Sequence, residues 1–442
     1  MNSRRRFARW HWLALVVVLL ASAWFQFTAA RETHLYNLGG PDAGSYASYA
    51  KNLHDFRIYS RHHPWEPING SPVPDAVSPP GYPLFLVPFL QGTPSWFLFM
   101  QRAIWAQAML GVLTVLLTVL LASRVAGPAA ALVVGLLTAV TPHLITITTN
   151  LLTESLFTFL LLASTFAFTC AVQDGKRWRW VVAGLLFGAC CLVRPTLQLL
   201  PLLALAVVAW RPGARPWLKG TAIAVACCTA LLLPWLAYQH TLPEQSGQLN
   251  LLRATLYHGS FPGMMYEGDP QTLGFAYDYD PRAAEIMSGN AALVDIIGAR
   301  MRAQPLRYLQ WYLVGKPLYF LSWDNSSPGA GDAFIEEVAD SPFFHRASFR
   351  LAHAAMYILH WPLMALGIAG ALLALLRPGL FANRTDVRAM RLVAGLAVAT
   401  IVLHMIGAPY PRYSIPFWPL FYLLAVALVQ VGSERIGSRG KT

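Results

Sequence analysis

Charged side chains are scarce in this sequence. Of its 442 residues, 12% are charged, whereas a soluble protein has about 25%. Apolar residues make up 56% of the chain, and the mean hydropathy is +0.45. The apolar residues come in runs of roughly twenty, the length that crosses about 30 Å of hydrocarbon. This scarcity of charge excludes a soluble globular protein and predicts an all-α membrane protein with many spans.

Cysteine is also rare. The five cysteines all lie inside apolar runs, and none has metal-ligand spacing with a histidine. We interpret them as small packing residues. The adjacent His62 and His63 cannot share a helical face, and a zinc site needs further ligands. The sequence therefore indicates no metal site, and the need for a divalent metal cofactor stays open.

A glycine-rich phosphate loop and a nucleotide-binding fold are likewise not apparent, and neither are internal repeats or low-complexity tracts. An activated substrate would therefore have to reach this protein by another route. The membrane is such a route, because a lipid can carry an activated group.

The apolar runs predict about ten transmembrane helices in a single domain that covers residues 1–442. We place them near residues 12–30, 97–122, 128–146, 152–172, 179–193, 196–210, 217–238, 351–376, 391–408 and 415–432. The first run follows a basic N-terminus, in which Ser3 to Phe7 resembles a twin-arginine export signal. Because nine further spans follow, we interpret the first run as an uncleaved anchor.

The net charge of +12 is distributed unevenly. Ten spans place both termini in the cytosol, and the cytosolic segments then hold 18 basic residues against three acids, Asp174, Asp386 and Glu434. Such an excess is what the positive-inside rule predicts. The charge therefore reports topology and predicts no nucleic-acid partner.

Two long segments, residues 31–96 and 239–350, then face outward. Arginine far outnumbers lysine, which is typical of a GC-rich bacterial genome, and we expect a bacterial inner (plasma) membrane with these segments in the periplasm. A borderline apolar run, Tyr308 to Trp323, lies in the second segment and contains Lys316. We interpret this run as an interfacial or re-entrant helix.

The first outward segment contains a carboxylate, Asp42, just beyond the first span. If residues 43–53 are helical, Tyr46, Ala50 and Leu53 follow Asp42 on one face at steps of four, four and three. Asp42 has two explanations: an N-cap of the helix that begins at Ala43, or a general base for a hydroxyl or amine acceptor.

Two further charges lie at outward span ends. Glu154 begins the fourth span. There it either interacts favourably with the positive end of the helix dipole or has a catalytic role. Arg194 precedes Pro195 between two apolar runs, where it either reaches toward the lipid headgroups or binds a phosphate.

The segment from Pro409 to Tyr413 joins the last two spans on the outward side and reads Pro-Tyr-Pro-Arg-Tyr. An arginine flanked by tyrosines suits a phosphorylated or sugar ligand. The alternative is an aromatic belt at the membrane interface. Both interpretations of Arg412 and Tyr413 stay open at this stage.

These motifs together resemble the GT-C glycosyltransferases, in particular the branch of the protein O-mannosyltransferases and the bacterial aminoarabinose transferase. The resemblance extends over roughly residues 1–430. It rests on motifs that occur in family order: Asp42-x3-Tyr46-x3-Ala50-x2-Leu53, Pro79-Pro80-Gly81-Tyr82-Pro83, Thr153-Glu154, Arg194-Pro195, Pro305-x2-Tyr308-x7-Lys316 and Arg412-Tyr413-x2-Pro416. The family often has a second acid beside the first, where this chain has Ala43.

The resemblance implies a GT-C-like fold with outward juxtamembrane helices, a polyprenyl-phosphate sugar donor and an aspartate base. The implied catalytic residues are Asp42 and Glu154, and the implied substrate-binding residues are Tyr46, Tyr82, Arg194, Lys316, Arg412 and Tyr413. The expected activity is an inverting sugar transfer to a glycolipid, glycan or protein at the outer membrane face. The alternative function is a transporter or flippase of lipid-linked sugars, whose site we would expect nearer the midplane.

Overall fold

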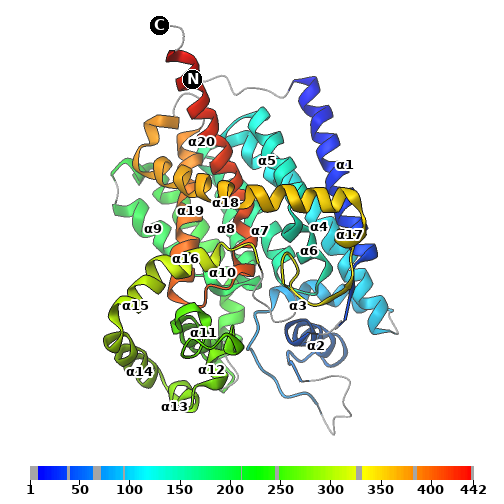
Figure 1. The fold of residues 1–442 in the computed structure, drawn as a ribbon, viewed down its shortest axis with the longest axis vertical. Coiled ribbons are helices and arrows are strands. Elements are labelled where there is room, and N and C mark those ends of the chain that lie inside the picture. The colour runs from blue at the N-terminus through cyan, green and yellow to red at the C-terminus, as the bar shows by residue number, and fades with distance from the viewer. Residues whose placement is uncertain are drawn as a thin grey trace.

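A computed structural model describes residues 8–36, 40–62, 71–92, 95–210, 212–243, 248–324, 331–381 and 386–439. These residues form a bundle of helices with shorter helices at one end (Figure 1). The only strands in the described part of the chain are β1 (His34–Leu35) and β2 (Val338–Asp340), which pair antiparallel. The predicted all-α class is therefore confirmed.

Seven of the described helices are long and apolar enough to cross a membrane: α1 (Arg9–Glu32), α4 (Trp96–Val125), α7 (Glu154–Asp174), α10 (Leu218–His240), α18 (Ala347–Leu376), α19 (Val387–Ile406) and α20 (Trp418–Arg439). The predicted spans near 179–193 and 196–210 correspond to α8 (Arg177–Val193) and α9 (Leu200–Trp210), of 17 and 11 residues. The expected count of ten is not confirmed, because these two helices are shorter than a typical span.

One predicted span is broken. Residues 128–146 form α5 (Pro128–Val140) and α6 (Pro142–Thr146), which continues as the 3-10 turn Ile147–Thr149, and the two parts meet at 62°. Pro142 has no N–H to continue the hydrogen bonding of α5, so the helix ends before it. With this bend included, eight spans are possible. The bend turns the chain toward the start of α7.

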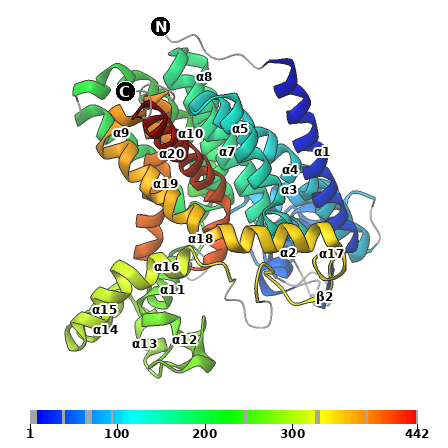
Figure 2. The same ribbon diagram turned by 45° about the horizontal axis from the view of Figure 1, so that its top comes forward.

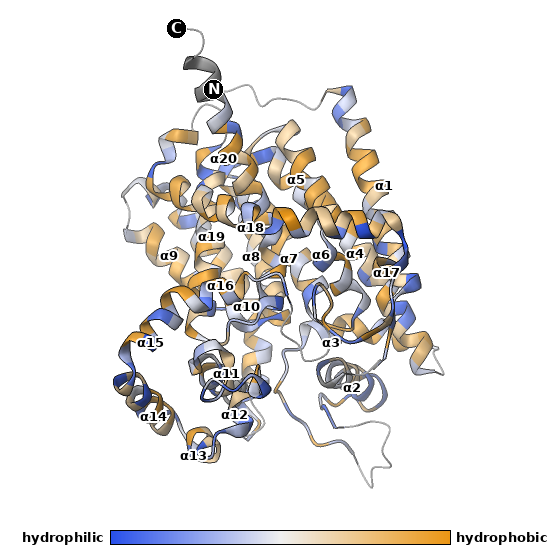
Figure 3. Cartoon of the chain, viewed as in Figure 1, coloured by the Kyte–Doolittle hydropathy of each residue, from blue (hydrophilic) through white to orange (hydrophobic). Residues whose placement is uncertain are grey.

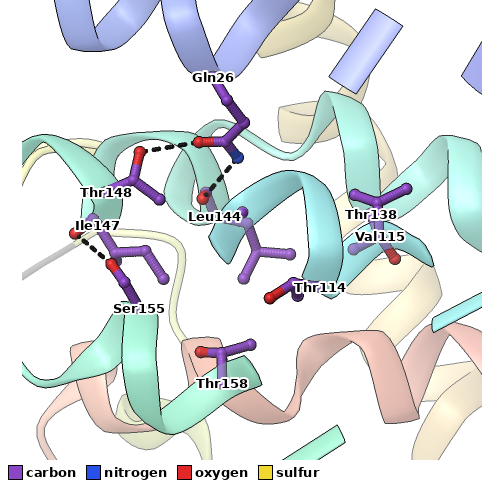
Figure 4. A pocket seen from close by; sticks show the side chains of 10 residues that line it. Gln26, Thr114, Val115, Thr138, Leu144, Ile147, Thr148, Ser155 and Thr158 are labelled. Carbon is purple, nitrogen blue, oxygen red and sulfur yellow. Dashed lines mark hydrogen bonds between the residues drawn. The ribbon is translucent and has the colours of Figure 1, made fainter. Parts of the chain in front are cut away.

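Buried polar contacts hold this bend in place (Figure 4). Gln26 of α1 donates its amide to the Leu144 carbonyl at 3.2 Å and accepts a hydrogen bond from Thr148 at 2.8 Å. Ser155 of α7 donates to the Ile147 carbonyl at 2.9 Å. The side chains enclose a cavity of about 10 Å³, room for roughly one water molecule. The segment that leads to Glu154 is therefore anchored to α1 and α7.

The bundle has two chemically different ends. The first turn of α1 and the last turns of α20 lie on the same side of the bundle, and we call this side the terminal end (Figures 1 and 2). At the opposite side, the loop end, lie α2 (Pro41–Phe56) and the helices α11 (Gln248–Ser260), α12 (Ala276–Tyr279), α13 (Ala283–Ser288), α14 (Asn290–Ala303) and α15 (Pro305–Gln310). Hydrophilic residues are frequent in these loop-end helices, whereas the long helices are mostly hydrophobic (Figure 3).

The run from Tyr308 to Trp323 forms part of a short helical segment. It comprises α15, a π-helical turn at Trp311–Gly315 and α16 (Lys316–Phe320). One face exposes Leu306, Leu309, Leu313 and Leu318, whereas Tyr308, Trp311 and Phe320 are buried. This segment is not among the seven long apolar helices. The interfacial interpretation is compatible with this arrangement and stays a prediction.

The two strands join the segments that precede α2 and α18. His34 pairs with Asp340 and Leu35 with Val338, and the amide of Tyr36 donates to the Glu337 carbonyl at 3.1 Å. After β2, α17 (Pro342–His345) leads into α18, which crosses the bundle at a steep angle to α1 (Figures 1 and 2). The pairing places Glu336 beside Gly40, at the start of α2.

Candidate active site

Asp42 lies in the first turn of α2 at the loop end. Its helix begins at Pro41 with Gly40 as the N-cap, so the alternative that Asp42 caps a helix from Ala43 is wrong. Pro41 fits the first helical position because its missing N–H has no partner there in any helix. The Asp42 side chain is 45% exposed, and its Oδ2 accepts a hydrogen bond from Arg412 Nη2 at 2.6 Å. One carboxylate oxygen is thus paired, and the side chain reaches the surface.

Arg412 connects Asp42 with a second acid. It lies in the 3-10 turn Pro411–Tyr413 between α19 and α20. Besides Asp42, its Nε is 3.8 Å from Glu154 Oε1. The planar guanidinium presents several N–H groups in fixed directions, which lets one arginine face two carboxylates.

Glu154 begins α7 and is buried, with 1% of its side chain exposed. Arg194 Nη2 donates to Glu154 Oε1 at 2.7 Å, and Arg194 Nε donates to the Thr153 hydroxyl at 3.0 Å. The Arg194 guanidinium also lies over the Tyr413 ring, with 4.5 Å to its centroid. A buried carboxylate is tolerated when it is paired and hydrogen-bonded, which explains this position. Arg194 therefore points into the cluster.

Tyr46 and Tyr82 support the same region from α2 and from α3 (Gly81–Leu86). Their rings meet edge to face, with centroids 5.2 Å apart. Burial raises the pKa of the Tyr46 phenol, and the neighbouring carboxylates Asp42 and Glu154 raise it further. Tyr82 is fully buried and donates its hydroxyl to Gln107 at 2.9 Å. In the structure the Tyr82 ring packs against the Tyr46 ring. A contact between Tyr82 and a substrate stays a prediction.

A third carboxylate, Glu336, lies beside this cluster and was missed in the sequence. A Cβ added to Gly40 would lie 2.8 Å from Glu336 Oε1, which places this carboxylate against the start of α2. Burial raises the pKa of Glu336; Arg412 lowers it and Asp42 raises it. The sequence offered little signal, because Glu336 reaches α2 only through the β1–β2 pairing.

Lys316 has other partners. Its ammonium is fully buried and donates to the carbonyls of Met405 and Gly407, each at 2.8 Å, near the end of α19. It also lies 3.9 Å from the centroid of the Tyr312 ring. The described contacts of Lys316 are therefore with backbone carbonyls and the Tyr312 ring, and its contact with a phosphate stays a prediction.

No group of three or more His, Cys, Asp or Glu side chains is arranged to hold a metal ion in the described ranges. Asp42 and Glu154 each face arginine nitrogens. His62 is described and its carbonyl accepts from Asn52 at 2.8 Å, whereas His63 lies outside the described residues.

Four segments far apart in the sequence thus meet at one site. We call Asp42, Glu154, Arg194, Arg412 and Tyr413 the loop-end cluster. It combines two arginines, a buried acid and a half-exposed acid. Such a set can hold a phosphate through the arginines and accept a proton at the exposed carboxylate.

Comparison with known proteins supports the fold of this chain. A family model described as dolichyl-phosphate-mannose-protein mannosyltransferase matches residues 97–238. The archaeal oligosaccharyltransferase AglB from Archaeoglobus fulgidus, solved with an inhibitory peptide and a dolichol-phosphate, aligns with a TM-score of 0.52 and 16% identity over 94% of this chain. An oligosaccharyltransferase from Archaeoglobus fulgidus, solved with a tethered acceptor peptide, aligns with a TM-score of 0.53 and 16% identity over 96% of this chain. No curated protein sequence matches significantly.

The chain spans about half the length of these oligosaccharyltransferase chains, with 50% of each covered. ArnT from Cupriavidus metallidurans, solved with undecaprenyl phosphate, aligns over 96% of this chain and 77% of its own, with 15% identity and a TM-score of 0.43. The predicted resemblance to GT-C glycosyltransferases is confirmed by the family model and by the oligosaccharyltransferase structures, whose fold the chain shares.

Proposed function

We propose that this protein is a membrane glycosyltransferase that moves a sugar from a polyprenyl-phosphate donor to an acceptor, with inversion at the anomeric carbon. The acceptor is a hydroxyl or amine of a glycolipid, a glycan or a protein. The observation that carries the proposal is the loop-end cluster, in which Arg412 joins the half-exposed Asp42 to the buried pair of Glu154 and Arg194.

The charge of the cluster and the comparisons support the proposed donor class. Two arginines suit an anionic phosphate, because a guanidinium donates a planar fork to phosphate oxygens. The description of the matching family names a dolichyl-phosphate sugar, and a solved structure of this fold contains a dolichol-phosphate. A lipid donor also agrees with a site at one end of an apolar bundle, where a headgroup can enter sideways from the membrane.

The proposed reaction is a direct displacement. The acceptor oxygen or nitrogen attacks the anomeric carbon, the bond from that carbon to the phosphate oxygen breaks, and Asp42 takes the acceptor proton. Polyprenyl phosphate leaves as a monoester with one more negative charge than the donor phosphodiester had. Arg194 and Arg412 stabilise this developing charge, which is the step at which fixed cations accelerate the reaction.

The pairing of Arg412 with Asp42 gives this reaction an order. In the structure the base candidate is held by the arginine that we assign to the phosphate. A donor phosphate that binds Arg412 replaces Asp42 as its partner and leaves the carboxylate free for the acceptor. We therefore expect the donor to bind before the acceptor. Glu154 keeps Arg194 in place during this exchange, through its 2.7 Å contact.

Mass spectrometry of glycolipids and surface glycans, with and without the protein, tests the function. The proposal expects that loss of the protein causes a polyprenyl-phosphate sugar to accumulate and one sugar to disappear from a surface glycan. In reconstituted vesicles, a new glycoside must form from the labelled donor. Movement of labelled lipid across the bilayer without glycoside formation would instead show a flippase.

The cellular setting belongs to the same proposal. We place the loop end on the periplasmic side of a bacterial inner membrane, with both termini cytoplasmic and the product a cell-envelope glycan. The domain is a single GT-C unit, in which residues 31–96 form the catalytic loop and residues 239–350 contribute the second part of the periplasmic face.

A further inference from the structure

Tyr410 lies two residues before Arg412 and contacts a different part of the loop end. Its hydroxyl is 2.9 Å from the Gly274 carbonyl and 2.9 Å from His258 Nδ1. A carbonyl can only accept, so the hydroxyl donates to Gly274, and His258 Nδ1 then donates to the hydroxyl. Burial lowers the pKa of His258 to about 4, so the imidazole is neutral near pH 7. One tyrosine thus links α11 with the loop before α12.

The backbone before Tyr410 is also enclosed by loop-end helices. A Cβ on Gly259 of α11 would overlap with the Gly407 backbone, so the two segments are in direct contact. Trp311 donates its indole N–H to the Gly259 carbonyl at 2.9 Å, and Lys316 donates to the Gly407 carbonyl at 2.8 Å. The path of residues 407–410 is therefore set by the helices of the segment 248–320.

This fixed path ends at the arginine that reaches both acids. Arg412 contacts Asp42 at 2.6 Å and lies 3.8 Å from Glu154, on segments that have no part in the Tyr410 contacts. A shift of the 410–412 backbone would move the guanidinium away from one acid or the other, and a misplacement of about 1 Å can cost about 100-fold in rate.

We propose that Tyr410 is a positioning residue for Arg412, and that its hydroxyl, held by His258 and Gly274, transmits the placement of the segment 248–304 to the phosphate-binding guanidinium. The inference rests on the proposed function, because its readout is sugar transfer. It adds a role for the segment 248–304, which otherwise has no contact with the loop-end cluster that we have described.

The test removes one hydroxyl. We expect Tyr410→Phe to lower kcat/KM for the polyprenyl-phosphate donor about three- to tenfold, the loss that corresponds to one hydrogen bond. The KM for the donor rises, while the KM for the acceptor and the thermal unfolding midpoint stay unchanged. His258→Gln, which alters the same contact from the other side, lowers the same constant. Tyr279→Phe is the matched control, because Tyr279 lies on α12 with 54% of its surface exposed.

A double-mutant cycle separates positioning from a general structural role. In an Arg412→Lys background, which has already lost the planar fork, Tyr410→Phe should cost less than twofold. An equal loss in both backgrounds would overturn the inference, and so would a Tyr410→Phe variant with the kinetics of the native protein. If Arg412→Ala itself transfers sugar normally, the proposed function loses its phosphate ligand, which is a separate outcome from failure of Tyr410 alone.

Discussion

The two ends of the bundle each contain a network of charged side chains, and the networks differ in what their acids contact. At the terminal end, Asp386 caps α19 by accepting from the amides of Arg388 and Ala389, each at 3.1 Å. Gln173 donates to Asp386 at 3.1 Å and to the Arg124 carbonyl at 3.0 Å. Oδ1 of Asp386 thus caps α19, and Oδ2 accepts a hydrogen bond from Gln173 of α7.

The acids of the loop-end cluster contact arginines instead. Asp42 has a single side-chain partner in the described structure, Arg412, and its side chain is 45% exposed, whereas Asp174 at the terminal end is 15% exposed and contacts Arg179. Ion pairs near a membrane edge are therefore no evidence of function by themselves. The two networks differ in a more informative way. Asp42 has one carboxylate oxygen without a side-chain partner in the described structure, and it lies beside an arginine that could bind a ligand instead.

The largest expected effect is that of Asp42→Asn, which keeps the shape and removes the base. We expect sugar transfer to fall by about 10²–10⁴-fold, the range for loss of a general base. The corresponding change at the terminal end, Asp174→Asn, should leave turnover within about twofold of that of the native protein, because substitutions away from the site have small effects. Rates measured in detergent with equal amounts of folded protein make the comparison. Equal losses in the two variants would remove the distinction between the networks.

Arg412 gives the next largest effect. Each hydrogen bond to a charged group contributes about 1.5–3 kcal/mol, so Arg412→Ala should lower transfer about 10- to 150-fold and weaken donor binding. Arg412→Lys keeps the charge and loses the fork, and partial activity should remain. Donor titration of purified variants measures both. If lysine serves as well as arginine, Arg412 only anchors the helix, and the same pair of changes at Arg194 then tests the remaining cation.

Asp386→Ala examines the terminal end alone. Loss of this N-cap should lower the free energy of unfolding by about 0.5–2 kcal/mol and leave kcat/KM unchanged, because no atom of the terminal network reaches the loop-end cluster in the described structure. Thermal unfolding in detergent and a transfer assay on the same sample provide the two readouts. A drop in kcat/KM with unchanged stability would connect the two ends.

The smallest expected effect is that of introducing a single cysteine, which tests how the protein is oriented in the membrane. Ser71 is exposed at the loop end and Gly213 is exposed in the turn Pro212–Trp217 that leads into α10. With Ser71→Cys and Gly213→Cys, a membrane-impermeant thiol reagent added to intact cells should label only position 71. The unmodified chain, which has five cysteines in apolar segments, is the control. Labelling at position 213 alone would reverse the proposed topology.

Much of the candidate site could be predicted from the sequence because its residues stand where apolar runs end. Four of its charged residues each interrupt or follow such a run: Asp42, Glu154, Arg194 and Arg412. A charge at the edge of an apolar span is energetically costly, so its presence there suggests a function. The pairing between them could not be predicted, since Asp42 and Arg412 are 370 residues apart. The sequence also gave no means to separate Lys316, which caps the carbonyls at the end of α19, from the two arginines of the cluster.

The fold shows a similar division. Long apolar helices follow from hydropathy and the break before Pro142 follows from the proline itself, whereas Gln26 and Ser155, which hold the 62° bend, come from other helices. Glu336 was missed because a two-stranded pairing of only five residues brings it to α2. Short pairings between distant segments carry almost no local signal, although they decide which acids meet.

The separation of 370 positions between Asp42 and Arg412 also has a consequence for biosynthesis. At about 5–20 residues per second, roughly 20–75 s pass between the synthesis of the aspartate and that of its arginine. Until Arg412 is made, the nascent chain has no residue that joins Asp42 to the pair of Glu154 and Arg194. Under the proposed function, a chain that stalls before Arg412 is made lacks the arginine that pairs with Asp42, and its rate of sugar transfer would report whether synthesis has passed this point.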